Sequence, residues 1–260
     1  MSSKLLLAAA NPPDPEALAR VAQLTLSGYA NTLSQVLGSP AAATLKNISA
    51  PPQPMAWTWI GDDSVIVLVN GTTDPHGEYG PQFVGWQAPL ETDGGAVNAW
   101  YSYAAQLYAA ALPGRVDMVI GHSMGGAIAV ELCKLLRDRG GDSANCVCVA
   151  LGAPRSRDSI AAAAISGTNT VQVGYVTDSV TVLPGDLPTG YSWRHPGRIY
   201  QMDDYGALTA VDEQPVGAGS AGLLLVRWGT APHAPQWYFD TLLRQITPGP
   251  DKRWPFHLDP

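Results

Sequence analysis

Runs of consecutive apolar residues alternate along the chain with segments in which apolar residues recur every three or four positions. The runs are rich in β-branched residues, which is typical of strands buried on both faces of a sheet. Segments with helical spacing lie between them, at 96–111, 127–139 and 237–246. This alternation predicts the α/β class, with a mostly parallel sheet flanked by helices on both faces. The predicted strands are residues 65–69, 117–120, 146–151, 171–176, 199–202 and 223–226.

Residues 1–58 are predicted to form a helix and a linker that pack against this α/β unit. Asp14 is placed to cap the helix, and Pro15 suits its first position. The helical spacing continues to position 37, after which Gly38 and Pro40 form a stop signal. A chain of 260 residues is long enough to bury one sizeable core, so we expect a single domain over 1–260.

The segment 74–95 is rich in glycine, proline and aromatic residues and shows no regular spacing. A loop of this length inside a compact domain is usually functional or mobile. We therefore expect 74–95 to form a lid or an active-site loop.

Composition excludes several classes of partner. The net charge is −7, and no stretch has the density of lysine and arginine that nucleic-acid binding needs. No phosphate-binding loop or metal-ligand spacing is present, so no cofactor or metal is expected. The three cysteines, Cys133, Cys146 and Cys148, are predicted to be buried as small hydrophobic residues, because two positions apart in a strand does not suit a disulfide.

The apolar run at residues 5–10 ends at a proline pair and is too short for the core of a signal peptide. No stretch approaches the roughly 20 apolar residues of a membrane span. The sequence predicts a soluble chain without an integral membrane segment and leaves open whether it is secreted or cytoplasmic.

The strongest chemical motif is Gly121-His122-Ser123-Met124-Gly125, which lies between a predicted buried strand and a predicted helix. A G-x-S-x-G sequence in this context is the nucleophile elbow of the α/β-hydrolase fold. Side chains at the two glycines would collide with backbone at the tight turn. Ser123 is therefore the candidate nucleophile.

A serine hydroxyl needs a base to attack at neutral pH. In this fold the order along the chain is serine, acid, then histidine, which leaves His195, His233 and His257. His233 is favoured because it lies in a loop just before the last predicted helix, whereas His257 lies in the terminal tail.

The acid should lie at the carboxyl edge of the sheet, where sites form in open α/β sheets. Asp178 directly follows the fourth predicted strand and is favoured for this reason. The alternatives are Asp186, Asp203 and Asp204.

An oxyanion formed during acyl transfer needs backbone N–H donors. One should come from Met124, the residue after the nucleophile, and the other from Thr72, in the turn after the first buried strand. Phe83, Trp86 and Leu223 are apolar residues that would suit an acyl-binding site, although residues of this kind equally suit a core.

Five segments together resemble the class three (fungal-type) lipases, in the same order along the chain. The region over which they are spread runs from about Val65 to Tyr238 and includes most of the chain. One departure is Asn70, where the family usually has arginine, and a second is the lid segment 74–95, which is not similar. The matching segments are Asn70-Gly71-Thr72, 121–127, Leu151-Gly152-Ala153-Pro154-Arg155, Asp178 with Leu183-Pro184, and His233 with Trp237-Tyr238.

The resemblance implies a carboxylic ester hydrolase that forms an acyl-enzyme, with Ser123, Asp178 and His233 as the triad and Thr72 and Met124 as oxyanion donors. It also implies a small-molecule ester or lipid substrate, such as an acylglycerol or another fatty-acyl ester, and transient contact with a lipid surface. The departures bear on the substrate and leave the chemistry unchanged.

Two further hypotheses fit the same sequence. In the second hypothesis, the chain uses this triad on cell-envelope lipids, as a phage-lysin or cutinase-like esterase, although cutinases are usually disulfide-bonded. A non-catalytic binding protein of the α/β-hydrolase fold is the third hypothesis. Such proteins typically lack the serine or the histidine, and both are present here.

Overall fold

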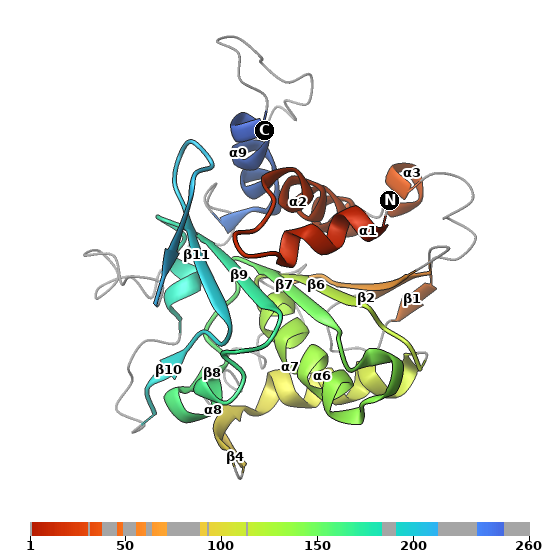
Figure 1. Ribbon diagram of the computed structural model, residues 1–260, viewed down its shortest axis with the longest axis vertical. Helices are drawn as coiled ribbons and strands as arrows, with labels where there is room; N and C mark the ends of the chain where they lie inside the picture. The colour runs from red at the N-terminus through yellow and green to blue at the C-terminus, as the bar shows by residue number, and fades with distance from the viewer. Residues whose placement is uncertain are drawn as a thin grey trace.

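The computed structural model describes residues 2–30, 32–37, 46–48, 56–60, 64–71, 89–92, 94–112, 114–183, 191–212 and 233–246. An eight-stranded sheet runs through the molecule (Figure 1). Its central strands, from β3 to β11, pair in parallel, and the outer strands pair antiparallel. In spatial order the strands are β1 (Lys46–Ile48), β2 (Ala56–Ile60), β3 (Val65–Val69), β6 (Met118–His122), β7 (Val147–Leu151), β9 (Thr170–Tyr175), β11 (Arg198–Met202) and β12 (Leu208–Val211).

Helices cover both faces of this sheet, as the sequence predicts (Figure 1). On one face lie α1 (Ser2–Leu5), α2 (Pro15–Tyr29) and α9 (Pro235–Ile246), and on the other lie α6 (Ala99–Ala111) and α7 (Met124–Arg139). The central strands are continuously apolar because each face is buried against helices. The fold class predicted from the apolar pattern is therefore confirmed.

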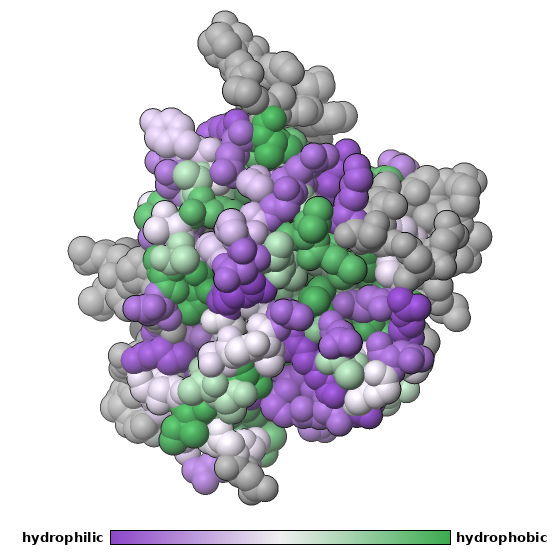
Figure 2. Space-filling model, in the orientation of Figure 1, coloured by the Kyte–Doolittle hydropathy of each residue, from purple (hydrophilic) through white to green (hydrophobic). Residues whose placement is uncertain are grey.

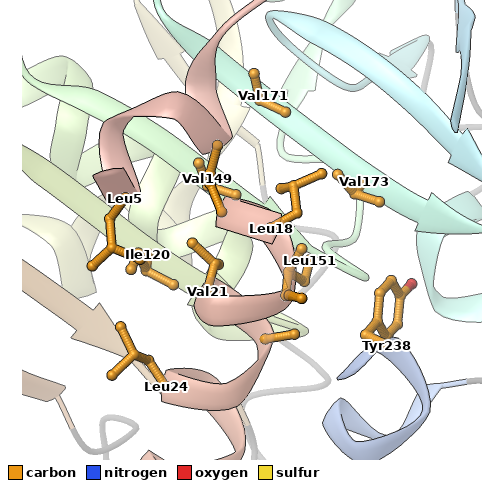
Figure 3. Close-up of a cluster of buried hydrophobic side chains, with 14 of the residues drawn as sticks. Leu5, Leu18, Val21, Leu24, Ile120, Val149, Leu151, Val171, Val173 and Tyr238 are labelled. Carbon is orange, nitrogen blue, oxygen red and sulfur yellow. The ribbon is translucent and has the colours of Figure 1, made fainter. Parts of the chain in front are cut away.

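Each face of the sheet has its own hydrophobic core, because successive side chains of a strand point to opposite faces. Ile120 faces α2 and packs in one cluster with Leu18 and Val21 (Figure 3). Its neighbour Val119 faces α7 and packs in the other cluster with Ile128. β6, the strand that leads into the nucleophile motif, is therefore packed against a hydrophobic cluster on each face.

The N-terminal helix begins as predicted, with the Asp14 side chain accepting a hydrogen bond from Ala17 N at 2.7 Å. The prediction that one helix continues to position 37 is wrong. α2 ends at Tyr29, and a separate short helix, α3 (Leu33–Leu37), follows. The break comes where Gly28 passes so close to β3 that an added Cβ would lie 2.7 Å from Leu68.

A second, four-stranded sheet was not predicted. It consists, in spatial order, of β10 (Trp193–Arg194), β8 (Arg157–Asp158), β5 (Gly95–Asn98) and β4 (Pro89–Thr92), beside the short helix α8 (Ser159–Ala163). The expected helix over 96–111 accordingly begins only at Ala99, because the Asn98 side chain caps it by accepting from Trp100 N and Tyr101 N. Of the predicted lid segment 74–95, the structure describes only 89–92 and 94–95, where residues 89–92 form β4, Gly94 lies in a turn and Gly95 begins β5.

The surface is polar with scattered apolar residues. Figure 2 shows one face of the molecule, on which hydrophilic residues lie beside several groups of hydrophobic residues. Among the described residues, the exposed large hydrophobic side chains come from several elements, and they include Leu7, Tyr103 and Ile160. Among the described residues, no helix is both long and apolar enough to cross a membrane.

Candidate active site

Ser123 lies at the sharp turn between β6 and α7 and has backbone angles of φ 56° and ψ −134°. Among the described residues it alone combines a side chain with a positive φ. A strained conformation of this kind persists only where the surroundings enforce it, and such sites are commonly functional. The flanking glycines make the turn: a Cβ on Gly121 would lie 2.2 Å from Gly125 O, and one on Gly125 would lie 2.2 Å from Asn70 O.

The structure brings the favoured nucleophile, base and acid together. Ser123 Oγ lies 2.8 Å from His233 Nε2, and His233 Nδ1 lies 2.9 Å from Asp178 Oδ2 and 3.0 Å from Asp178 Oδ1. Because a carboxylate only accepts, Nδ1 carries the histidine proton and Nε2 is left to accept from the serine hydroxyl. All three side chains are buried, so water competes little for these hydrogen bonds.

Asp178 caps the 3₁₀ turn after β9, where Val180 N donates to its Oδ1 at 2.9 Å. Its Oδ2 also accepts from the Tyr238 hydroxyl at 2.7 Å. Burial is the main cause that raises the pKa of Tyr238 well above its ordinary value, and the nearby Asp178 carboxylate raises it further. The Tyr238 hydroxyl therefore remains a donor. No role at the acid was predicted for Tyr238 from the sequence. Tyr238 follows His233 by five positions, in the first turn of α9 (Pro235–Ile246), and this spacing is the signal that could have placed it near the base.

The competing candidates lie elsewhere or outside the described residues. His195 is buried between Gln172 Oε1, at 2.9 Å, and the Thr181 carbonyl, at 2.6 Å. Asp203 accepts from Tyr205 N and Ala207 N in a surface turn. Asp204 accepts from the Tyr175 hydroxyl, while His257 and Asp186 lie outside the described residues.

Of the two predicted oxyanion donors, the structure describes only Met124, the first residue of α7. A helix N-terminus carries partial positive charge, so the Met124 N–H suits a developing oxyanion. Thr72 lies outside the described residues, but its neighbour Gly71 lies against the elbow, where an added Cβ would be 2.7 Å from Ser123 Cβ. The three predicted acyl-site residues, Phe83, Trp86 and Leu223, also lie outside the described residues.

In the part of the chain that the structure describes, no three histidine, cysteine, aspartate or glutamate side chains are grouped so that they could hold a metal ion. All three cysteines are free thiols and are buried on the α7 side of the sheet, as the sequence predicts. The chemistry available at Ser123 is nucleophilic attack with proton transfer to His233.

Comparisons with known proteins agree with this fold. The model of a thioesterase-domain family matches residues 80–173, a range that includes the elbow but ends before Asp178 and His233. Among curated proteins, none matches the sequence.

Several solved lipase structures superpose on most of the chain. A fungal lipase in complex with an inhibitor has a TM-score of 0.63 at 19% identity and covers 90% of this chain and 98% of its own. The Lip2 lipase of Yarrowia lipolytica has a TM-score of 0.60 at 12% identity and covers 86% of this chain and 92% of its own. The triacylglyceride lipase of Rhizomucor miehei has a TM-score of 0.58 at 18% identity, with the same coverage of 86% and 92%. The chain therefore has the α/β-hydrolase fold that these lipases share.

Proposed function

We propose that this protein is a serine carboxylic ester hydrolase that acts through an acyl-enzyme. The observation that carries the proposal is the unbroken hydrogen-bonded series from Ser123 through His233 to Asp178, built on a strained elbow. A serine, a base and an orienting acid in this geometry are the general arrangement for acyl transfer.

In the first half of the reaction, Ser123 Oγ attacks the carbonyl carbon of the ester while its proton moves to His233 Nε2. The carbonyl oxygen becomes an oxyanion, which the N–H of Met124 and, as we propose, that of Thr72 stabilise. The intermediate then collapses, the bond to the alcohol oxygen breaks, and His233 donates its proton to that oxygen. Asp178 holds the histidine in the required tautomer and stabilises its positive charge.

In the second half, a water molecule attacks the acyl carbon while His233 takes one of its protons. The bond to Ser123 Oγ breaks, and His233 returns the proton to the serine. The products are a free acid and an alcohol, and the enzyme is restored.

For the substrate, we infer a fatty-acyl ester such as an acylglycerol, with transient contact at a lipid surface. Support comes from the order of the motifs that resemble class three lipases and from the fold shared with fungal lipases. Under this proposal Phe83, Trp86 and Leu223 contact the acyl chain, and 74–95 covers the site.

A thioester is the second candidate substrate, because the thioesterase-domain model matches 80–173. The same triad would attack a thioester carbonyl and release a thiol instead of an alcohol. An oxyester and a thioester with the same acyl group therefore separate the two candidates by their kcat/KM values.

The test is hydrolysis of p-nitrophenyl esters from acetate to palmitate by the wild type and by Ser123→Ala. Ser166→Ala is a suitable control, because that serine is exposed and only bonds to the Ala163 carbonyl. We expect the wild type and the control to be active and Ser123→Ala to lose about 10³-fold or more in kcat. Activity that survives in Ser123→Ala, or failure of a serine-directed phosphonate to label Ser123 in the wild type, would refute the proposal.

A further inference from the structure

Two side chains beside the triad, the half-buried Tyr29 and the buried His122, have no role in the proposed reaction. Tyr29, at the end of α2, lies with its hydroxyl oxygen 2.9 Å from His122 Nδ1. His122, the residue before the nucleophile, lies with its Nε2 2.8 Å from the backbone carbonyl oxygen of His233. The amide of Gly71 donates to the Tyr29 oxygen at 2.6 Å. These contacts connect the turn after β3 to the backbone of the proposed base.

The direction of every hydrogen bond in this series follows from its ends. The His233 carbonyl can only accept, so Nε2 of His122 carries the proton. Nδ1 of the neutral ring then has a free electron pair and accepts from the Tyr29 hydroxyl. The Tyr29 oxygen in turn accepts from the Gly71 N–H. Each group is satisfied in only one arrangement, which suits a device that fixes positions rather than one that moves protons.

The surroundings keep His122 neutral. Burial is the main cause that lowers its pKa well below the ordinary value, and the nearby His233 lowers the pKa further. The two imidazole rings are 5.0 Å apart between centroids, so a charged His122 would oppose the imidazolium that forms on His233 during the reaction. Burial likewise raises the pKa of Tyr29, which remains a hydroxyl donor.

The two ends of the series are the two positions that acyl transfer requires to be aligned. Gly71 immediately precedes Thr72, and the close contact of its backbone with Tyr29 needs a glycine, since a Cβ there would lie 2.3 Å from the Tyr29 oxygen. At the other end, the held carbonyl belongs to His233 itself. Small displacements of an oxyanion donor or a base lower the rate strongly.

We propose that Tyr29 and His122 act as one unit of positioning residues, which holds the oxyanion-side turn at Gly71 and the backbone of His233 in a fixed relation to Ser123. This inference rests on the proposed ester hydrolase function. It assigns a mechanistic reason to the histidine at position 122 of the elbow and to the tyrosine that ends α2.

Replacing His122 with glutamine or with asparagine removes one of its two hydrogen bonds at a time, because each amide side chain can take the place of one ring nitrogen. In His122→Gln, the terminal amide can reach the Nε2 position and donate to the His233 carbonyl, but the contact to Tyr29 is lost. In His122→Asn, the shorter side chain can accept from Tyr29 but does not reach the carbonyl. Tyr29→Phe removes the hydroxyl and keeps the ring.

We expect about a tenfold loss in kcat for Tyr29→Phe and His122→Gln and about a hundredfold loss for His122→Asn, with KM changed less than about twofold. Because His122→Gln already lacks the contact to Tyr29, Tyr29→Phe added to His122→Gln should cost less than about threefold more. Tyr200→Phe is the matched control, because this buried tyrosine lies on β11, three strands from β6, and donates to Asn11 Oδ1 at 2.8 Å. Its kcat should stay within about twofold of the wild type.

The assays use p-nitrophenyl butyrate, with active sites counted by phosphonate labelling of Ser123 and folding checked by thermal unfolding. A kcat for Tyr29→Phe equal to that of Tyr200→Phe, or losses that multiply in the double variant, would overturn the inference while the wild-type activity still supports the proposed function. An inert wild type that the phosphonate does not label would overturn both. Should Tyr29→Phe not fold, the order of His122→Gln above His122→Asn decides the question.

Discussion

Replacing Glu131 with glutamine tests how α7 is joined to the second sheet. Arg157, on β8, binds the Glu131 carboxylate at two points, with Nη2–Oε2 at 2.6 Å and Nε–Oε1 at 2.9 Å. Both side chains are almost fully buried, at 4% and 5% exposure. In Glu131→Gln the amide NH₂ would meet a guanidinium donor, and the arginine charge would remain buried without a counter-charge.

Breaking a buried pair in this way costs about 3–5 kcal/mol, because the remaining charge has left water without compensation. A domain of this kind has a free energy of unfolding of about 5–15 kcal/mol, so the loss is large enough to measure. Urea unfolding followed by tryptophan fluorescence gives the change from the midpoint and slope. The double variant Glu131→Met with Arg157→Met should lie within about 1 kcal/mol of the wild type, since apolar replacement of a buried pair is often neutral.

The single variant Arg157→Met adds a dependence on pH. Burial is the main cause that raises the pKa of Glu131, and Arg157 opposes it, so removing Arg157 raises that pKa further. The folded protein then binds a proton that the unfolded chain has released, and stability falls as pH rises above the ordinary pKa of glutamate. We expect Arg157→Met to be less stable at pH 8 than at pH 5, by up to about 1.4 kcal/mol for each unit of pKa shift.

A loss of less than about 1 kcal/mol in Glu131→Gln, or a double variant as unstable as the sum of both singles, would refute the reasoning.

Three further predictions follow from the site and the core. Tyr238→Phe removes the 2.7 Å hydrogen bond to Asp178 and should lower kcat about ten- to a hundredfold, measured against Tyr200→Phe. Gly125→Ala places a Cβ 2.2 Å from Asn70 O and should abolish ester hydrolysis, whereas Gly167→Ala, with no atom within 4 Å, should leave it unchanged. The thiols should not react with a disulfide reagent in the native protein, and all three should react after unfolding. Fast reaction of any thiol in the native state would contradict the burial of that cysteine.

The apolar pattern predicted the central strands well because each of them is buried on both faces and carries a continuous run of large residues. It missed β2 and β12, which lie toward the edges of the sheet and mix polar with apolar residues. It also missed the hairpin of β4 and β5, since the side chains of β4 are all exposed and leave no apolar signal. Asn98 was included in a predicted helix because capping by its side chain depends on geometry rather than on hydrophobicity.

For the site, the local motif alone predicts Ser123 as the nucleophile, whereas the choice among acids and histidines also depends on topology. Asp178 reaches His233 because β9 lies beside β7, which itself lies beside β6, and this order places the end of β9 near the elbow. Asp203 and Asp204 follow β11, one strand further from the elbow, and bond to other groups there. The chain order of serine, acid and histidine reduces the number of candidate residues, and the position of Asp178 directly after a predicted strand favours it. Its distance from Ser123, however, depends on the order of the strands in the sheet.

The contacts of Tyr29 could not be predicted from the sequence pattern of its own segment. Its partners are Gly71 and His122, 42 and 93 positions away in sequence, and they meet because α2 packs across the face of β3 and β6. The helix ends at this tyrosine with a glycine before it, so the chain can approach β3 closely at the point where the hydroxyl is needed. Three separate features then have one explanation, which is the contact between the segments that carry Tyr29, Gly71 and His122. These features are the end of α2 at Tyr29, the glycine at position 28 and the neutral histidine at position 122. If the double-variant experiment shows coupling between Tyr29 and His122, the break in the N-terminal helix is itself part of the site.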